Sequence, residues 1–382
     1  MNIEILGVDP KNKGAALMLE ALRVRFTEHY PNARFCVSLS YDTVARVNSG
    51  LWAILPKQTK KKELVSVTLE NLLPSGLLKK LGIVKSSDIN IVVDASGFAY
   101  GDFWGAKKLE KRLGANVENW KKDGKKIIVL PQAWGPFKEP GFKNSLSKVI
   151  RNVDILFARD NQSYGFIEDL SGQQNNVFQA PDFTNVLKVP LKENLQKYKN
   201  STFVIPNEKV IESFGEEARN DYLSFLALSC DQLLEAGHKV VMLIHEGSKD
   251  LKLAEAILAK SKSGKEAIEV LHLVSPLDTK AVIANSRAIV SSRFHGLVSA
   301  LSSGVPSLAC GWSHKYEELL SDYSCSDYVV DFRNKELSAK ALSDFISKIE
   351  TDSFRSEIKS ASLKQKELTE DMWKKVFQRI EK

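Results

Sequence analysis

An arginine and a histidine lie two residues apart in the segment SSRFHG (291–296), after an apolar run and before a short apolar helix-like stretch. Arg293 carries a planar fork of donors that can bind a carboxylate or a phosphate through two hydrogen bonds. The imidazole of His295 titrates near neutral pH and can donate a proton. Gly296 lets the backbone approach a ligand closely. The pair therefore predicts an anionic substrate that is held and protonated; the alternative is a surface arginine beside a structural histidine.

A second arginine follows another apolar run. Arg159 comes directly after DILFA (154–158), and Asp160 or Asn161 then begins a predicted helix. The guanidinium suits a carboxylate or phosphate ligand. A structural ion pair with Asp160 or a neighbouring carboxylate explains the same arginine, and both interpretations stay open.

Three further positions are candidates for substrate binding. Asn12 can cap a helix in NKGAALMLEAL, and Gly14 allows a ligand to approach the free amides of that helix N-terminus, which attract anions. Asp182 lies in APDF (180–183).

Two more candidates lie in the segment GWSHKYEEL (311–319). Lys315 adds a cation, and His314 is a competing proton donor. The alternative for His314 is a histidine at a helix start, in contact with solvent.

Short apolar runs alternate with amphipathic segments along the chain, which predicts parallel sheets covered by helices on both faces. Two helices are expected at 15–30 and 216–236. The expected strands are 3–8, 34–39, 89–95, 126–131, 154–158, 201–206, 239–245, 267–273, 287–292 and 306–310. Ligands of open parallel sheets bind beyond the carboxyl ends of the strands, where most of the candidate residues lie.

The strand pattern restarts after about residue 185, so we expect an α/β protein with two doubly wound, Rossmann-like domains. The predicted domains are 1–187 and 188–335, with C-terminal helices in 336–382. A length of 382 residues suits two domains better than one core.

Composition excludes several classes of protein. The four cysteines have no CxxC spacing, so neither a zinc site nor a disulfide framework is expected. The net charge is +7, but basic residues with interleaved aromatic residues form no stripe, so no nucleic-acid partner is expected. A solvated basic surface, an anionic substrate and a membrane surface remain as explanations of the charge.

The N-terminus lacks the apolar core of a signal peptide, which predicts a cytoplasmic protein. Residues 57–80 combine flanking lysines, among them Lys57, Lys60, Lys61 and Lys62, with a leucine-rich stretch. This segment predicts either peripheral contact with the inner face of a membrane or ordinary packing against the first domain's sheet.

Several blocks together resemble the polysaccharide pyruvyl transferase family, in the family's order. The blocks are NKGAALMLEAL (12–22), PQAWGPF (131–137), ILFARDNQSY (155–164), APDF (180–183) and SSRFHGLVSALSSGVPSLACGWSHKYEELL (291–320). One block departs: where many relatives have a GGG loop, this chain has DASGFAYGD (94–102).

The resemblance implies a GT-B-like arrangement in which the C-terminal helices cross back onto the first domain. It places the acceptor on the first domain and the donor, phosphoenolpyruvate, on the second. Pyruvyl transfer to two hydroxyls of a sugar, in a glycan or a lipid-linked precursor, would form a cyclic ketal and release phosphate. His295, Arg293 and Arg159 match the family's plausible catalytic set, with Lys315, His314, Asn12, Gly14 and Asp182 as binding residues. No metal or organic cofactor is expected.

The alternative function is that of a nucleotide-sugar-dependent GT-B glycosyltransferase or epimerase. Retaining enzymes of that type commonly carry two glutamates eight positions apart. Here Glu317 and Glu318 are followed at that spacing by Cys325 and Ser326, so the pair is missing.

Overall fold

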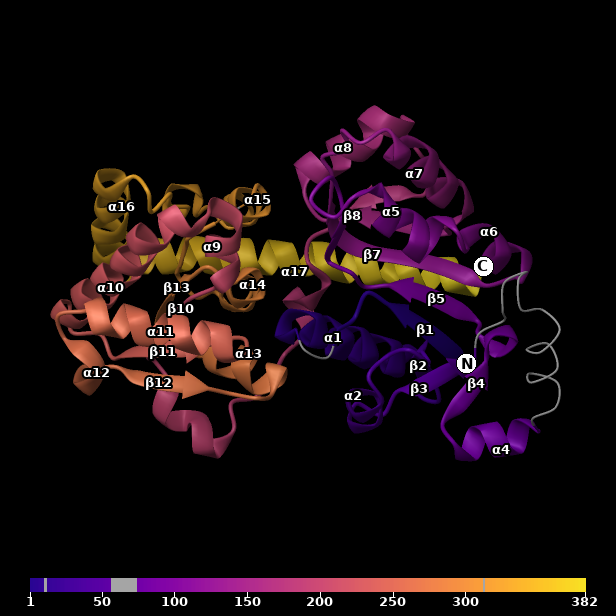
Figure 1. Ribbon diagram of the computed structural model, residues 1–382, viewed down its shortest axis with the longest axis horizontal. Helices are drawn as coiled ribbons and strands as arrows, with labels where there is room; N and C mark the ends of the chain where they lie inside the picture. The colour runs from indigo at the N-terminus through magenta and orange to yellow at the C-terminus, as the bar shows by residue number, and fades with distance from the viewer. Residues whose placement is uncertain (10–11, 56–73, 312) are drawn as a thin grey trace. The chain divides into compact units, whose positions relative to one another are not determined.

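The computed structural model describes residues 1–9, 12–55, 74–311 and 313–382. Its contacts divide the chain into two compact units. The first comprises Met1–Pro10, Met18–Phe183 and Asp371–Lys382, and the second comprises Lys11–Leu17 and Thr184–Glu370. Each unit contains one parallel sheet covered by helices (Figure 1). The membrane-contact segment proposed for 57–80 lies mostly outside the described residues.

The sheet of the first unit has nine parallel strands among the described residues. In spatial order they are β4 (Ile83–Lys85), β3 (Trp52–Leu55), β2 (Arg34–Ser38), β1 (Asn2–Leu6), β5 (Ile91–Asp94), β7 (Lys126–Trp134), β8 (Ile155–Ala158) and β9 (Val177–Gln179), with β6 (Phe98–Tyr100) paired to β7. The helices of this unit are α2 (Thr43–Asn48), α4 (Ser75–Lys80), α5 (Ala106–Leu109), the π-helix η2 (Glu110–Gly114), α6 (Val117–Lys122), α7 (Gly141–Asn152) and α8 (Asn161–Ser171).

The sheet of the second unit has five parallel strands in the described part of the chain. Their spatial order is β12 (Glu269–His272), β11 (Val240–Ile244), β10 (Thr202–Ile205), β13 (Ala288–Ser291) and β14 (Ser307–Ala309). The helices are α9 (Glu208–Phe214), α10 (Arg219–Glu235), α11 (Ser248–Lys260), α12 (Gly264–Ala267), α13 (Pro276–Ala284), α14 (Phe294–Leu301), α15 (Lys315–Asp322) and α16 (Lys335–Lys348).

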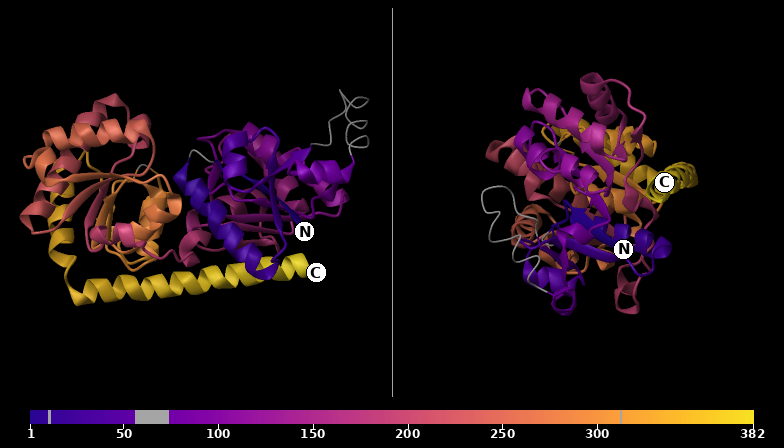
Figure 2. Two further views of the ribbon diagram at one scale, coloured as in Figure 1. Left: turned by 90° about the horizontal axis from the view of Figure 1, so that it is seen from below. Right: turned by 90° about the vertical axis from the view of Figure 1, so that its right-hand side faces the viewer.

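Two helices contribute to both units. Helix α1 (Lys13–His29) gives its first residues to the second unit and the remainder to the first. The 30-residue helix α17 (Asp352–Glu381) is continuous and passes from the second unit into the first at Asp371 (Figure 2). The expected fold class, α/β with two Rossmann-like domains, is therefore confirmed. Of the C-terminal helices that were expected to cross back, only the end of α17 joins the first unit, whereas α16 belongs to the second.

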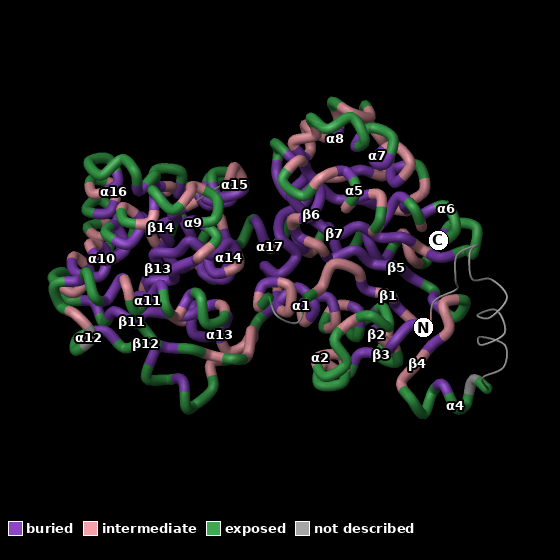
Figure 3. Tube along the Cα trace, in the orientation of Figure 1, coloured by how far each residue is buried: buried purple, intermediate pink, exposed green. Residues whose placement is uncertain are grey.

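The strands are apolar because both of their faces are covered. β8, β10, β11, β13 and β14 consist of buried residues throughout, as Figure 3 shows for the centres of both sheets. Continuous apolar strands are typical of parallel sheets between two helical layers. All ten expected strands are present, whereas β3, β4, β6 and β9 were not predicted.

No helix among the described residues has the length and apolar character needed to cross a membrane.

The end of α17 completes the core of the first unit. Trp373 is fully buried and meets the rings of Phe26 and Phe183 edge-on, each at 6.0 Å between centroids. Replacing a buried tryptophan with alanine removes this contact area and leaves a cavity.

We predict that Trp373→Ala lowers the free energy of unfolding by about 3–5 kcal/mol, measured by urea unfolding. Lys375→Ala is the matched control, because Lys375 is exposed on the same helix. An unfolding midpoint of Trp373→Ala equal to that of the control would show that α17 is not part of this core.

Candidate functional site

The segment that carries Arg293 is fixed at the carboxyl edge of the second sheet. Ser292 follows β13, and its N–H donates to the carbonyl of Ile205, the last residue of β10 (3.0 Å). The carbonyl of Ser292 accepts hydrogen bonds from Asn207 Nδ2 and from the Tyr316 hydroxyl, both at 2.9 Å. These hydrogen bonds to Ser292 therefore fix the position of the Arg293 backbone at the edge of the sheet.

Arg293 is a buried cation between two carboxylates. Its side chain is 10% exposed; Nη1 lies 2.7 Å from Glu246 Oε2, and Nη2 pairs with Asp250 Oδ2. Burial alone would lower the pKa of Arg293, but Asp250 and Glu246 together raise it. The guanidinium is thus permanently charged and its orientation is fixed before any substrate binds.

Lys13, the first residue of α1, belongs to the same charged cluster. Its Nζ donates to the carbonyl of Ile244 at the end of β11 (3.2 Å). Burial lowers the pKa of Lys13 to about 8; Glu246 and Asp250 act in the opposite direction, and Arg293 adds to the lowering. An ammonium with this pKa is charged at neutral pH but can release its proton in mild base.

His245 lies directly after β11, beneath the cluster. Burial lowers the pKa of His245 well below its usual value, and the charges of Arg293, Lys13 and His295 lower it further. Its Nδ1 has no hydrogen-bond partner among the described residues. Burial and the neighbouring positive charges therefore both favour the neutral form of His245.

Gly14 gives His295 its space. A Cβ atom at Gly14 would lie 2.3 Å from Nδ1 of His295, closer than real Cβ contacts come. Asn12 caps α1 as expected, because its Oδ1 accepts the N–H of Ala15 at 2.9 Å. The missing side chain of Gly14 leaves room for the imidazole ring, and its role in ligand binding stays a prediction. His295 itself is half-buried.

The space on one side of Arg293 is not suited to an anion. A cavity of about 270 Å³ adjoins the guanidinium. Its charged lining consists of Glu208, Glu212, Glu246 and Asp250 against Lys209, Lys249 and Arg293. The carboxylates outnumber the cations there. Lys13 and His295 are not among the residues that line this cavity.

Lys315 lies against the residue between Arg293 and His295. It is the first residue of α15, it is buried, and its Nζ is 5.3 Å from the centre of the Phe294 ring. His314 precedes it, half-buried, at the N-cap position of α15. The structure therefore brings Lys315 to the SSRFHG segment.

The first unit holds a second cluster of candidates. Arg159 follows β8 and is buried, and its Nη1 lies 3.4 Å from Asp182 Oδ2. Asp160 instead caps α8 by accepting the N–H of Ser163 (2.7 Å). Gln132 on β7 accepts the N–H of Arg159 through its carbonyl, at 3.0 Å. Gln132 is completely buried, and its side-chain amide has no partner within the described ranges.

Sequence reasoning missed three of these residues. Lys13 lies between two candidates, Asn12 and Gly14, but only its hydrogen bond to the carbonyl of Ile244 shows that it reaches the end of β11. Asp250 lies within α11, outside any strand end, so only the fold shows that it pairs with Arg293. Gln132 was within a recognised block, PQAWGPF, but no pattern indicated an unpartnered amide.

The packing of Gly14 against His295 generates a prediction. Gly14→Ala should displace the imidazole and shift the side-chain NMR resonances of His295, because overpacking forces neighbouring groups to move. Gly165→Ala is the control: it also places alanine within a helix, where a Cβ has no atom within 4 Å. Unchanged His295 resonances in Gly14→Ala would show that the two residues do not pack as described.

Solved structures with the same fold span almost the whole chain. A glycosyltransferase from Rickettsia africae superposes with a TM-score of 0.57 at 11% identity, covering 99% of this chain and 97% of that one. A UDP-GlcNAc 2-epimerase from Neisseria meningitidis, bound to UDP-GlcNAc, gives 0.57 at 12% identity and covers 94% of each chain. The UDP-GlcNAc 2-epimerase from Methanocaldococcus jannaschii superposes with a TM-score of 0.53 at 13% identity, covering 91% of this chain and 93% of that one. At these identities the likeness concerns the fold alone.

No curated protein matches the sequence. The sequence model described as "Polysaccharide pyruvyl transferase" matches residues 12–314, which include Lys13, both arginines and His295. This span is most of the chain, so the chain belongs to the polysaccharide pyruvyl transferase family.

Proposed function

We propose that the chain transfers the pyruvyl group of phosphoenolpyruvate onto two hydroxyls of one sugar, in a polysaccharide or its precursor. The observation that carries this proposal is the charged cluster of Lys13, Arg293 and His295 at the carboxyl edge of the second sheet. Family membership supports it independently. The product would be a cyclic ketal, and phosphate would be released.

The reaction needs a proton donor and a positive site. Phosphoenolpyruvate carries a carboxylate and a phosphate on C2 and a methylene at C3. Protonation of C3 makes C2 electrophilic; one sugar hydroxyl then adds to C2, and the C2–O bond to phosphate breaks. The second hydroxyl adds to the same carbon and closes the ring. Both hydroxyls lose their protons, and the phosphate leaves with the electrons of its bond.

The residues fit these tasks. His295 is the proposed general acid, because it is half-buried and titratable. Lys13 and Lys315 supply positive charge for the phosphate, and Arg293 supplies a fixed cation whose field stabilises the anionic donor and the departing phosphate. Arg159, which pairs with Asp182, is the proposed anion-binding residue of the first unit.

Glu246 and Asp250 change the role that the sequence predicted for Arg293. The guanidinium already donates to two carboxylates, so it acts through its charge and its remaining donors rather than as an empty two-pronged clamp. Its Nε has no partner among the described residues. Arg293 is therefore a cation of fixed position, whereas Lys13 is the cation of the site whose charge can change with pH.

A nucleotide-sugar substrate is the second candidate, because the structural neighbours include UDP-GlcNAc epimerases. The glutamate pair expected of retaining GT-B enzymes is absent at 317 and 325. A thermal shift decides between the two: phosphoenolpyruvate should raise the melting temperature, and UDP-GlcNAc should not. The reverse result would favour the nucleotide-sugar function.

We predict that His295→Ala lowers acceptor-dependent phosphate release from phosphoenolpyruvate by about 10²-fold or more, the scale of a lost general acid. His272→Ala is the matched control, because His272 is exposed at the end of β12. Turnover of a folded His295→Ala variant at the rate of the control would remove His295 from the role.

Lys13 gives the reaction a pH dependence of known sign. Its pKa of about 8 means that the ammonium is lost as pH rises through 8. Phosphoenolpyruvate binding, measured by calorimetry, should therefore weaken between pH 7 and pH 9. In Lys13→Arg the cation persists, because a guanidinium stays protonated in this range, and the weakening should disappear. The same pH profile in both proteins would contradict the role of Lys13.

A further inference from the structure

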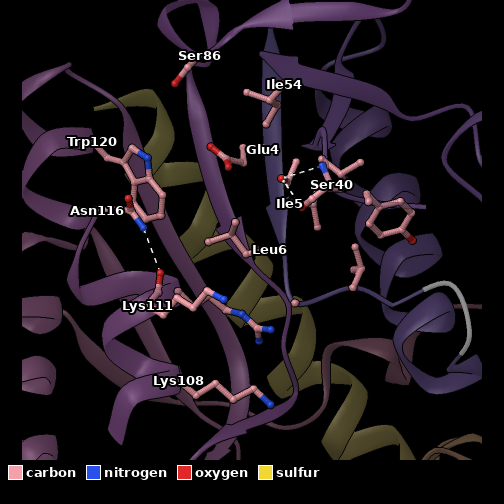
Figure 4. A pocket seen from close by; sticks show the side chains of 16 residues that line it. Glu4, Ile5, Leu6, Ser40, Ile54, Ser86, Lys108, Lys111, Asn116 and Trp120 are labelled. Carbon is pink, nitrogen blue, oxygen red and sulfur yellow. Dashed lines mark hydrogen bonds between the residues drawn. The ribbon is translucent and has the colours of Figure 1, made fainter. Parts of the chain in front are cut away.

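The first unit has a large pocket of its own, separate from Arg159. Its volume is about 740 Å³, and it lies at the carboxyl edge of β1 and β2, where ligands of open parallel sheets bind. Leu6 and Ser38 end these two strands, and both line the pocket. Figure 4 shows Trp120, Lys111 and Lys108 on one side, Ser40 on the other, and Glu4 between them.

One wall of the pocket is basic. Lys108 on α5 and Lys111 and Arg112 on η2 all line it, whereas Glu4 is the single carboxylate among the described residues of the lining. Burial raises the pKa of Glu4, although Lys125 acts in the opposite direction. The pocket therefore has a net positive charge and favours an anion.

Arg112 is held in place by a buried network. Its Nη1 donates to Ser96 Oγ at 2.7 Å. Asp94, which ends β5, accepts hydrogen bonds from the backbone and hydroxyl of Ser96 and from the hydroxyl of Tyr100. Asp94, Ser96 and Tyr100 belong to the loop DASGFAYGD (94–102), which stands where many relatives have a GGG loop. The departure thus positions a cation in the pocket.

The other groups of the pocket suit a sugar. Trp120 contributes an aromatic ring, and Ser38, Ser40 and Tyr41 contribute hydroxyls. Burial raises the pKa of Tyr41 to about 12, so its hydroxyl stays protonated and can donate. An aromatic ring on one wall and hydroxyls on the other can bind a sugar through apolar contact and hydrogen bonds.

We propose that this pocket binds the sugar acceptor and selects one that carries a phosphate. Arg112 and Lys111 would bind the phosphate, and Trp120 with the hydroxyls would bind the sugar. The proposal rests on the proposed function, which requires a sugar acceptor. A free glycosyl phosphate and a glycosyl group linked to a lipid through phosphate share this chemistry.

Calorimetry without phosphoenolpyruvate tests the proposal. The probes are the 1-phosphates of galactose, glucose and N-acetylmannosamine, each compared with the methyl glycoside of the same sugar. At least one phosphate should bind about tenfold or more tightly than its glycoside, since a hydrogen bond to a charged group contributes on that scale. Lys111→Gln and Arg112→Gln should each remove most of this preference.

Lys107→Gln is the matched control, because Lys107 lies on the same helical segment, is exposed and does not line the pocket. It should retain the preference. The same sugars linked through diphosphate to a short prenol distinguish the two kinds of acceptor. If they bind more tightly than the sugar 1-phosphates, the acceptor is linked to a lipid. If they bind equally tightly, the acceptor is a free sugar phosphate.

Two results would overturn the proposal. The first is that the wild-type protein prefers the phosphate over the methyl glycoside for none of the sugars. The second is that UDP binds more tightly than every sugar phosphate and loses this affinity in Lys111→Gln and Arg112→Gln. Failure of this proposal can be distinguished from failure of the proposed function. A phosphate preference without pyruvyl transfer contradicts only the function, and pyruvyl transfer to neutral glycosides without any phosphate preference contradicts only the pocket.

Discussion

The ion pairs of Arg293 with Glu246 and Asp250 are the interaction on which the site of the second unit depends. Removing one partner of a buried ion pair leaves an uncompensated charge at a cost of several kcal/mol, about 3–5 in comparable cases. Arg293 is therefore a fixed cation in the folded protein. Burial is the main cause of the lowered pKa values of Lys13 and His245, and the field of Arg293 lowers both further.

The parallel sheet explains why these residues meet. β10, β11 and β13 are neighbours, and the residues that follow them are Asn207, His245 and Arg293. Asp250 comes from the helix after β11, and Lys13 and Gly14 come from the start of α1, which belongs to the second unit. Segments far apart in the sequence thus supply the cations, the carboxylates and the space for His295.

The sequence was sufficient for the main strands and for the motif residues, because continuous apolar runs and their flanking polar residues follow directly from burial between helical layers. The strands β3 and β9 were not predicted, although β14, which is as short as β9, was. The carboxylates that pair with Arg293 and Arg159 could not be identified from the sequence either. Asp250 lies inside a helix and Asp182 follows a short edge strand, so each pairing depends on tertiary structure.

The central claim is that this cluster protonates C3 of phosphoenolpyruvate during transfer to a sugar. NMR of the product formed in D₂O tests it most directly, because the new methyl group must take its third hydrogen from a group that exchanges with solvent. The account predicts a cyclic ketal whose methyl group carries one deuterium, formed by the wild-type protein and not by His295→Ala. A sugar product without a ketal methyl group, or a ketal methyl group without deuterium, would contradict it.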